Sequence, residues 1–142
     1  MQHINDMTME KIMMVRAARN QYPINGSLEL LPLCNMNCDM CYVRLDYKQV
    51  EERGGLHSVE EWMDLARQMA DAGVLFLLLT GGEPLLFPGF QELYLELKKL
   101  GMIITINTNG TLINEEWADF FEKNPPRRIN ITLYGSDDTA YE

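Results

Sequence analysis

Residues 74–84 read Val-Leu-Phe-Leu-Leu-Leu-Thr-Gly-Gly-Glu-Pro. Six consecutive apolar residues ahead of a turn signal predict a strand over Val74–Leu79, covered on both faces as in a parallel sheet. A helix is predicted just before it, because Ser58-Val59-Glu60-Glu61 is a capping box and apolar residues follow at helical spacing. Gly73 stands where a helix usually ends. The stretch therefore completes a helix–strand unit.

The same unit repeats along the chain. Residues 89–100 and 114–124 are predicted to be helices, the second capped by Asn114. The other predicted strands are Leu28–Leu33, Met102–Ile106 and Ile129–Leu133. Helices that alternate with strands indicate right-handed crossovers between parallel strands, so the predicted fold class is α/β with a parallel sheet.

The N-terminal segment is predicted to be separate from this pattern. Asn5–Asn20 is expected to form a methionine-rich helix that ends before Pro23 and Gly26 and packs on the domain like a lid. Residues 42–55 receive no assignment. The predicted organisation is a helical extension over residues 1–26 and a core domain over residues 27–142.

All three cysteines follow the first predicted strand, as Cys34-x3-Cys38-x2-Cys41. The carboxyl ends of parallel strands meet at one edge of a sheet, where sites gather. We therefore expect the cysteines to share a face with the turns that follow the other three predicted strands. These turns are Gly81–Pro84, Asn107–Gly110 and Tyr134–Asp138.

Three clustered thiols allow several interpretations of what they bind. A disulfide would leave one cysteine without a partner. A structural zinc ion needs a fourth ligand, which His3, His57 or a carboxylate would have to supply. A [4Fe–4S] cluster normally takes four cysteines, one for each iron, so three would leave one iron open to a small molecule. The spacing favours the cluster and keeps zinc as the alternative.

Charge and segment composition narrow the class of protein. The formal net charge is −9, from 21 acidic and 12 basic residues, which argues against a nucleic-acid groove and against docking on anionic lipid. No signal peptide is recognisable, and no apolar run approaches the roughly 18 residues that span a bilayer. We expect a cytoplasmic protein, in a compartment where clustered cysteines bind metal more often than they form disulfides.

These motifs together resemble the radical S-adenosylmethionine (radical SAM) superfamily. The cysteine triplet resembles its cluster motif, and Gly81-Gly82-Glu83-Pro84 resembles its GGE turn. Thr108–Leu112 and Ile131–Gly135 resemble the stretches that follow its third strand and form its fourth-strand ribose region. One departure is Met40, where the family usually has an aromatic residue, with Tyr42 just after the motif.

The resemblance implies a partial TIM barrel and two cofactors. Cys34, Cys38 and Cys41 would bind a [4Fe–4S] cluster, and its open iron would bind the amine and carboxylate of S-adenosylmethionine (SAM). Reductive cleavage would give a 5′-deoxyadenosyl radical that abstracts hydrogen from a substrate, making the protein an oxidoreductase supplied by a reductant such as flavodoxin or ferredoxin. The residues implied in cofactor binding are Gly81, Gly82, Glu83, Pro84, Tyr42, Thr132, Ser136 and Asn109, with Glu83 or the glycine carbonyls facing the amine and the hydroxyls of Thr132 and Ser136 facing the ribose.

The triplet and Ile131–Gly135 are most similar to the peptide- and protein-modifying (SPASM-type) branch. About four of the six core strands are recognisable, so the chain is expected to be the N-terminal part of a longer protein or a truncated one. Strand Ile129–Leu133 would then be an exposed edge, and the isolated chain would be marginally stable or oligomeric. The alternative functions are a non-catalytic module that holds a cluster or zinc and binds a peptide, and a structural zinc domain.

Overall fold

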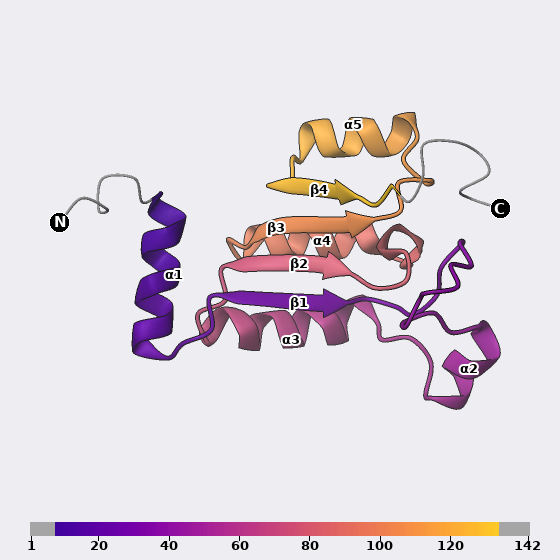
Figure 1. The fold of residues 1–142 in the computed structure, drawn as a ribbon, viewed down its shortest axis with the longest axis horizontal. Helices are drawn as coiled ribbons and strands as arrows, with labels where there is room; N and C mark the ends of the chain where they lie inside the picture. Colours follow the sequence, from indigo (N-terminus) through magenta and orange to yellow (C-terminus); the bar gives the residue numbers. More distant parts are fainter. Residues whose placement is uncertain (1–7, 134–142) are drawn as a thin grey trace.

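The computed structural model describes residues 8–133, which contain one parallel sheet (Figure 1). Its strands are β1 (Asn25–Glu29), β2 (Phe76–Thr80), β3 (Ile103–Thr108) and β4 (Arg128–Ile131), in the order β1-β2-β3-β4. Each strand pairs in parallel with the next, for example Leu28 with Leu79 and Leu79 with Ile106. The predicted α/β class and parallel pairing are confirmed.

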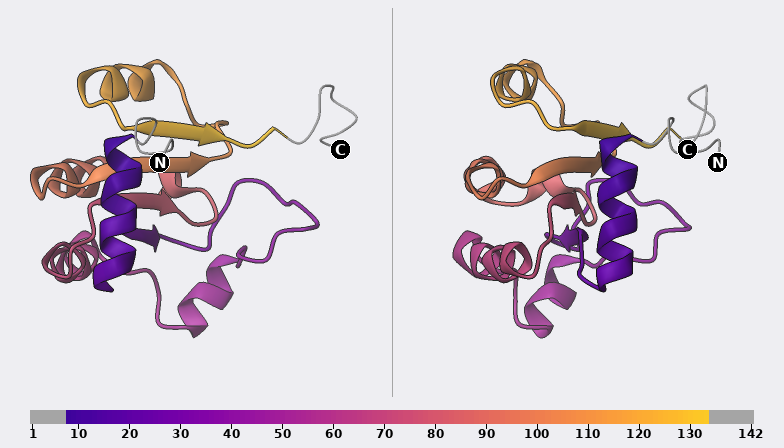
Figure 2. Two further views of the ribbon diagram at one scale, coloured as in Figure 1. Left: turned by 60° about the vertical axis from the view of Figure 1, so that its left-hand side comes forward. Right: turned by 90° about the vertical axis from the view of Figure 1, so that its left-hand side faces the viewer.

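Helices connect the strands and cover one face of the sheet. The elements are α1 (Met9–Asn20), α2 (Tyr47–Glu52), α3 (Val59–Asp71), the 3₁₀ turn η1 (Pro84–Leu86), α4 (Phe90–Lys99) and α5 (Glu115–Lys123). Figure 2 shows α3, α4 and α5 on the same side of the strands. The predicted caps hold: Ser58 and Glu61 form a capping box, and the Asn114 side chain accepts from Trp117 N.

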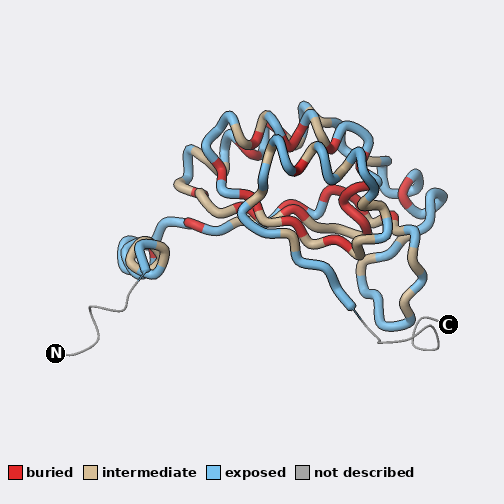
Figure 3. The backbone as a smooth tube through the Cα atoms, turned by 90° about the horizontal axis from the view of Figure 1, so that it is seen from above, coloured by how far each residue is buried: buried red, intermediate tan, exposed pale blue. Residues whose placement is uncertain are grey.

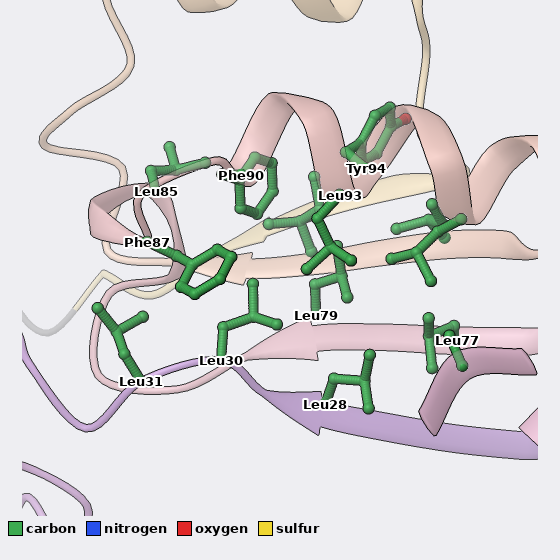
Figure 4. Packing of buried hydrophobic residues seen from close by; sticks show 14 of the residues in the cluster. Leu28, Leu30, Leu31, Leu77, Leu79, Leu85, Phe87, Phe90, Leu93 and Tyr94 are labelled. Carbon is green, nitrogen blue, oxygen red and sulfur yellow. The ribbon is translucent and has the colours of Figure 1, made fainter. Parts of the chain in front are cut away.

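The hydrophobic core lies between these helices and the sheet, where Figure 3 shows most of the buried residues. Leu77 and Leu79 alternate with half-buried neighbours on β2, so that their side chains point towards the helices. They pack with Leu93 and Tyr94 of α4 (Figure 4). Burying one leucine side chain contributes about 1.5–3 kcal/mol, so this layer stabilises the frame that carries the strand ends.

The opposite face of the sheet is open in the described residues. Phe76 and Leu78 are half-buried there, which corrects the prediction that this strand is covered on both faces. A cavity of about 500 Å³ lies on this face, lined by side chains that include Ser27, Thr105 and Asn130. The apolar run of β2 therefore reflects one packed face and one open face.

The first strand lies earlier than predicted. β1 is Asn25–Glu29, so the predicted strand Leu28–Leu33 is wrong in position, and the sheet begins ahead of the residue 26/27 boundary. Asn25 and Ser27 are exposed, and a Cβ on Gly26 would lie 2.2 Å from the Met69 side chain, so the first three residues of the strand gave no apolar signal. Residues 30–33 follow β1 and bond to the end of β2 and the turn after it, through contacts that include Leu30 N to Thr80 O at 2.9 Å and Gly82 N to Leu31 O at 2.7 Å.

The N-terminal helix does not lie over the cysteines. α1 ends at Asn20, where Gln21 takes the left-handed conformation, and it lies by the amino ends of the strands (Figures 1 and 2). The Glu10 carboxylate pairs with the Arg127 guanidinium just before β4. This helix therefore lies away from the edge of the sheet that carries the cysteines.

Helix α2 lies in the segment that received no assignment. Asp46 caps it, its side chain accepting from Gln49 N at 2.8 Å while Gln49 Oε1 accepts from Asp46 N at 2.9 Å. Only Val50 of this six-residue helix is buried, so the apolar periodicity was too short to predict it. The helix lies in the segment that joins the cysteine loop to α3.

Two surface properties complete the description of residues 8–133. No helix in that range combines the length and the apolar character needed to cross a membrane. Within the described chain β4 pairs only with β3, and Ile131 and Leu133 are 56% and 78% exposed. The expectation that this edge promotes association stays a prediction.

Candidate functional site

A cavity of about 380 Å³ lies at the carboxyl ends of the strands. Cys34, Cys38 and Cys41 line it together with residues from the turns after β2 and β3. The other lining residues are Met36, Met40, Tyr42, Val43, Thr80, Gly81, Gly82, Asn107, Thr108, Asn109 and Thr132. The expectation that these strand ends share a face is confirmed for three of the four segments, while Tyr134–Asp138 lies outside the described residues.

The three cysteines differ in their surroundings. Cys34 and Cys38 are half-buried and Cys41 is exposed, and Cys41 N donates to Cys38 O at 3.0 Å in a tight turn. Cys34 Sγ accepts from Met36 N at 3.4 Å and from Asn109 Nδ2 at 3.7 Å. Among residues 8–133, no three His, Cys, Asp or Glu side chains converge closely enough to bind a single metal ion.

This arrangement fits a cluster better than a zinc ion. A zinc ion needs its ligands to converge on one centre, whereas each cysteine of a [4Fe–4S] cluster binds a different iron, so the thiols surround a volume. Three thiols around one cavity satisfy the second requirement. His57, a candidate fourth zinc ligand, contacts Glu61 and Trp62 at the start of α3 instead, and His3 lies outside the described residues.

Gly81 and Gly82 both line the cavity, but the fold itself requires them to be glycines. A Cβ on Gly82 would lie 2.2 Å from Leu33 O, and a Cβ on Gly81 would lie 2.4 Å from Leu31 O. The backbone of residues 30–33, which follow β1, occupies the space that side chains would need. The sequence suggested close approach of a ligand, whereas the structure shows close approach of the chain's own backbone.

The Glu83 carboxylate is buried and does not line the cavity. It is 0% exposed, and Oε1 accepts from Leu85 N at 3.0 Å and from Thr108 Oγ1 at 2.8 Å. Oε2 accepts from Asn109 N at 2.8 Å. Three donors offset the cost of burying a carboxylate, so Glu83 joins the turn after β2 to the turn after β3.

Asn109 connects the turn after β3 to the cysteine loop. Its Nδ2 donates to Asn35 Oδ1 at 2.8 Å, and its Oδ1 accepts from Thr111 N at 2.9 Å and from Thr111 Oγ1 at 2.6 Å. Asn35 Nδ2 in turn donates to Thr111 Oγ1 at 2.8 Å. Asn35 and Thr111 were not predicted as site residues, although Thr111 lies within the Thr108–Leu112 motif, because the bonds that join Asn35 to Asn109 and Thr111 span more than 70 positions.

The remaining predicted site residues fall into three groups. Tyr42 and Thr132 line the cavity, and the Tyr42 side chain is 91% exposed. Pro84 is buried as the first residue of η1 and does not line the cavity. Ser136 lies outside the described residues. The structure therefore brings Tyr42, Thr132, Asn109 and the two glycines to the cysteines, but not the Glu83 carboxylate or Pro84.

Residues 28–142 match the family described as the radical SAM superfamily. The chain belongs to this superfamily. It is 30% identical over 117 residues to the sporulation killing factor maturation protein SkfB of Bacillus subtilis, covering 82% of this chain and 28% of SkfB. It is also 30% identical over 108 residues to a GTP 3′,8-cyclase of Clostridium perfringens, covering 75% of this chain and 33% of the cyclase.

Solved structures confirm the fold. The structure of Streptococcus suis SuiB bound to precursor peptide SuiA superposes with a TM-score of 0.68 at 21% identity, covering 89% of this chain and 28% of SuiB. SuiB bound to SAM superposes with a TM-score of 0.64. The chain thus spans about a third or less of these proteins, and it has the partial TIM-barrel architecture of radical SAM enzymes. Membership of the superfamily implies a [4Fe–4S] cluster and SAM as cofactors.

Proposed function

We propose that this chain carries the cluster and SAM site of a radical SAM enzyme. The observation that supports this most strongly is the single cavity of about 380 Å³ that all three cysteines line with residues from the strand-end turns. Cys34, Cys38 and Cys41 would each bind one iron of a [4Fe–4S] cluster and leave one iron without a protein ligand. When bound and reduced, the cluster supplies the electron that converts SAM into methionine and a 5′-deoxyadenosyl radical, which abstracts hydrogen from the substrate.

The chain's own residues bind and orient the cofactor. The Gly81–Gly82 backbone borders the cavity, and its carbonyls are the candidate acceptors for the SAM amine, because the Glu83 oxygens are already bonded elsewhere. The Thr132 hydroxyl and the Asn107 amide line the same cavity and are candidate partners for the ribose hydroxyls. Met36, Met40 and Val43 supply apolar contacts on the cysteine side.

The position of the cysteines near the surface suits electron delivery. Cys41 is exposed, and the adjacent Met40 and Tyr42 side chains are 73% and 91% exposed. A small reductant such as flavodoxin or ferredoxin could therefore approach the cluster from this side. The substrate class that we favour is a peptide or protein. SkfB is named as the maturation protein of a killing factor, and SuiB was solved with its precursor peptide bound.

The catalytic test is release of 5′-deoxyadenosine. After anaerobic reconstitution with iron and sulfide, the protein is expected to convert SAM into 5′-deoxyadenosine when dithionite is added, because the open iron and the reduced cluster are both then present. Chromatography with mass detection measures the product, and the same sample without dithionite is the control. A protein that binds a full cluster but releases no 5′-deoxyadenosine would be a non-catalytic module, and tight binding of zinc without iron would contradict the proposal.

A further inference from the structure

The orientation of the Asn109 side chain is determined by its neighbours. Thr111 N is a donor whatever the side chains do, so the Asn109 atom 2.9 Å away is the amide oxygen. The Asn109 amide nitrogen must then face Asn35 Oδ1 and Cys34 Sγ, 2.8 and 3.7 Å away. The Asn109 backbone is fixed independently, because its N–H donates to the buried Glu83 carboxylate at 2.8 Å.

The three cysteine sulfurs are consequently not equivalent. Cys34 Sγ accepts from both a backbone N–H and the Asn109 amide. Within residues 8–133, neither the Cys38 nor the Cys41 sulfur accepts a hydrogen bond. Hydrogen bonds to the sulfurs of an iron–sulfur cluster are among the factors that set its reduction potential. Because N–H donors favour the more negatively charged reduced form, they raise that potential.

We propose that Asn109 is a positioning residue that raises the reduction potential of the cluster through its amide contact with Cys34. Glu83 holds Asn109 in place and so acts on the same property from the turn after β2. This assignment rests on the proposed function, and it gives Glu83 a role other than binding the SAM amine. It explains why the Glu83 carboxylate is buried where two turns that border the cysteines meet, bonded to Thr108, which lies 25 positions later in the sequence.

The variant Asn109→Leu tests the contact, with Asn130→Leu as its matched control. Each substitution removes one 2.8 Å hydrogen bond between two asparagines, Asn109 to Asn35 or Asn130 to Asn107. Asn109→Leu also removes the acceptor for Thr111 N and Thr111 Oγ1, but it alone removes a donor to a cysteine sulfur. Redox potentiometry of the reconstituted protein, followed by electron paramagnetic resonance, is expected to show a more negative potential for Asn109→Leu and the wild-type value for Asn130→Leu.

Glu83→Gln provides a second test that leaves Asn109 in the chain. The glutamine oxygen can keep the bonds to Leu85 N and Thr108 Oγ1, whereas its NH₂ group would face the Asn109 N–H and lose that bond. We expect the potential to shift in the same direction as in Asn109→Leu.

The outcomes separate this inference from the proposed function. A wild-type potential in Asn109→Leu, or in Glu83→Gln if the leucine variant binds no cluster, overturns the inference while the cluster site stands. An equal shift in Asn130→Leu overturns it as well, because the effect would not depend on the sulfur contact. Wild-type protein that takes up no iron contradicts the proposed function itself.

Discussion

Cys38→Ala is expected to lower the iron content after anaerobic reconstitution from about four per chain to less than one. The described residues offer no other cysteine to replace the lost thiolate, since all three already line the cavity. With two cysteines left, two irons of a [4Fe–4S] cluster would lack protein ligands. Iron and acid-labile sulfide assays measure the loss, and the visible charge-transfer absorption should disappear with it.

Met36→Leu is the matched control for this substitution. Met36 lies in the same loop and lines the same cavity, but its thioether is not among the proposed ligands. Its backbone N–H, which donates to Cys34 Sγ, stays in place. The variant should retain about four irons per chain. If Cys38→Ala also retained them, Cys38 would not be a ligand.

Gly82→Ala is expected to destabilise the protein by about 3 kcal/mol and to prevent normal cluster assembly. The new Cβ would lie 2.2 Å from Leu33 O and 2.9 Å from Pro32 O, both backbone atoms that cannot move as a flexible side chain can. Relief of the clash would separate the turn after β2 from the segment leading to Cys34, and would stretch the 2.7 Å bond from Gly82 N to Leu31 O. Urea unfolding of the metal-free protein measures the loss.

Gly101→Ala distinguishes this clash from the general cost of replacing a glycine. Gly101 follows α4 at φ +82°, and a Cβ there would meet nothing within 4 Å. The expected cost is therefore only that of a non-glycine residue in the left-handed region, about 1 kcal/mol. Equal destabilisation by the two substitutions would show that contact with residues 32–33 does not decide the Gly82 position.

The parallel sheet and its helices could be predicted because local signals agreed with the fold. β2 and β3 have packed faces of leucine and isoleucine, and the helices between strands begin at recognisable caps such as Ser58. The first strand was predicted too late in the sequence because Asn25, Gly26 and Ser27 of β1 carry no apolar pattern. Helix α2 was missed because it contributes one buried residue.

The candidate site was predicted in outline and not in its internal bonding. The spacing of the cysteines and the position of the turns at strand ends are readable from the sequence, because topology brings strand ends together. The partners of Glu83 are not readable, since Thr108 and Asn109 lie 25 and 26 positions away and their contact depends on strand register. The need for a glycine at position 82 is not readable from the sequence either, because it depends on tertiary contact with the backbone of Leu33.

The central claim is that Cys34, Cys38 and Cys41 hold a [4Fe–4S] cluster whose remaining iron binds SAM. Mössbauer spectroscopy of protein reconstituted with the Mössbauer-active iron isotope tests it most directly, because each iron contributes separately to the spectrum. Addition of SAM is expected to change the parameters of about one quarter of the iron absorption and to leave the rest unaltered. A spectrum with equivalent irons that SAM does not change would contradict the account.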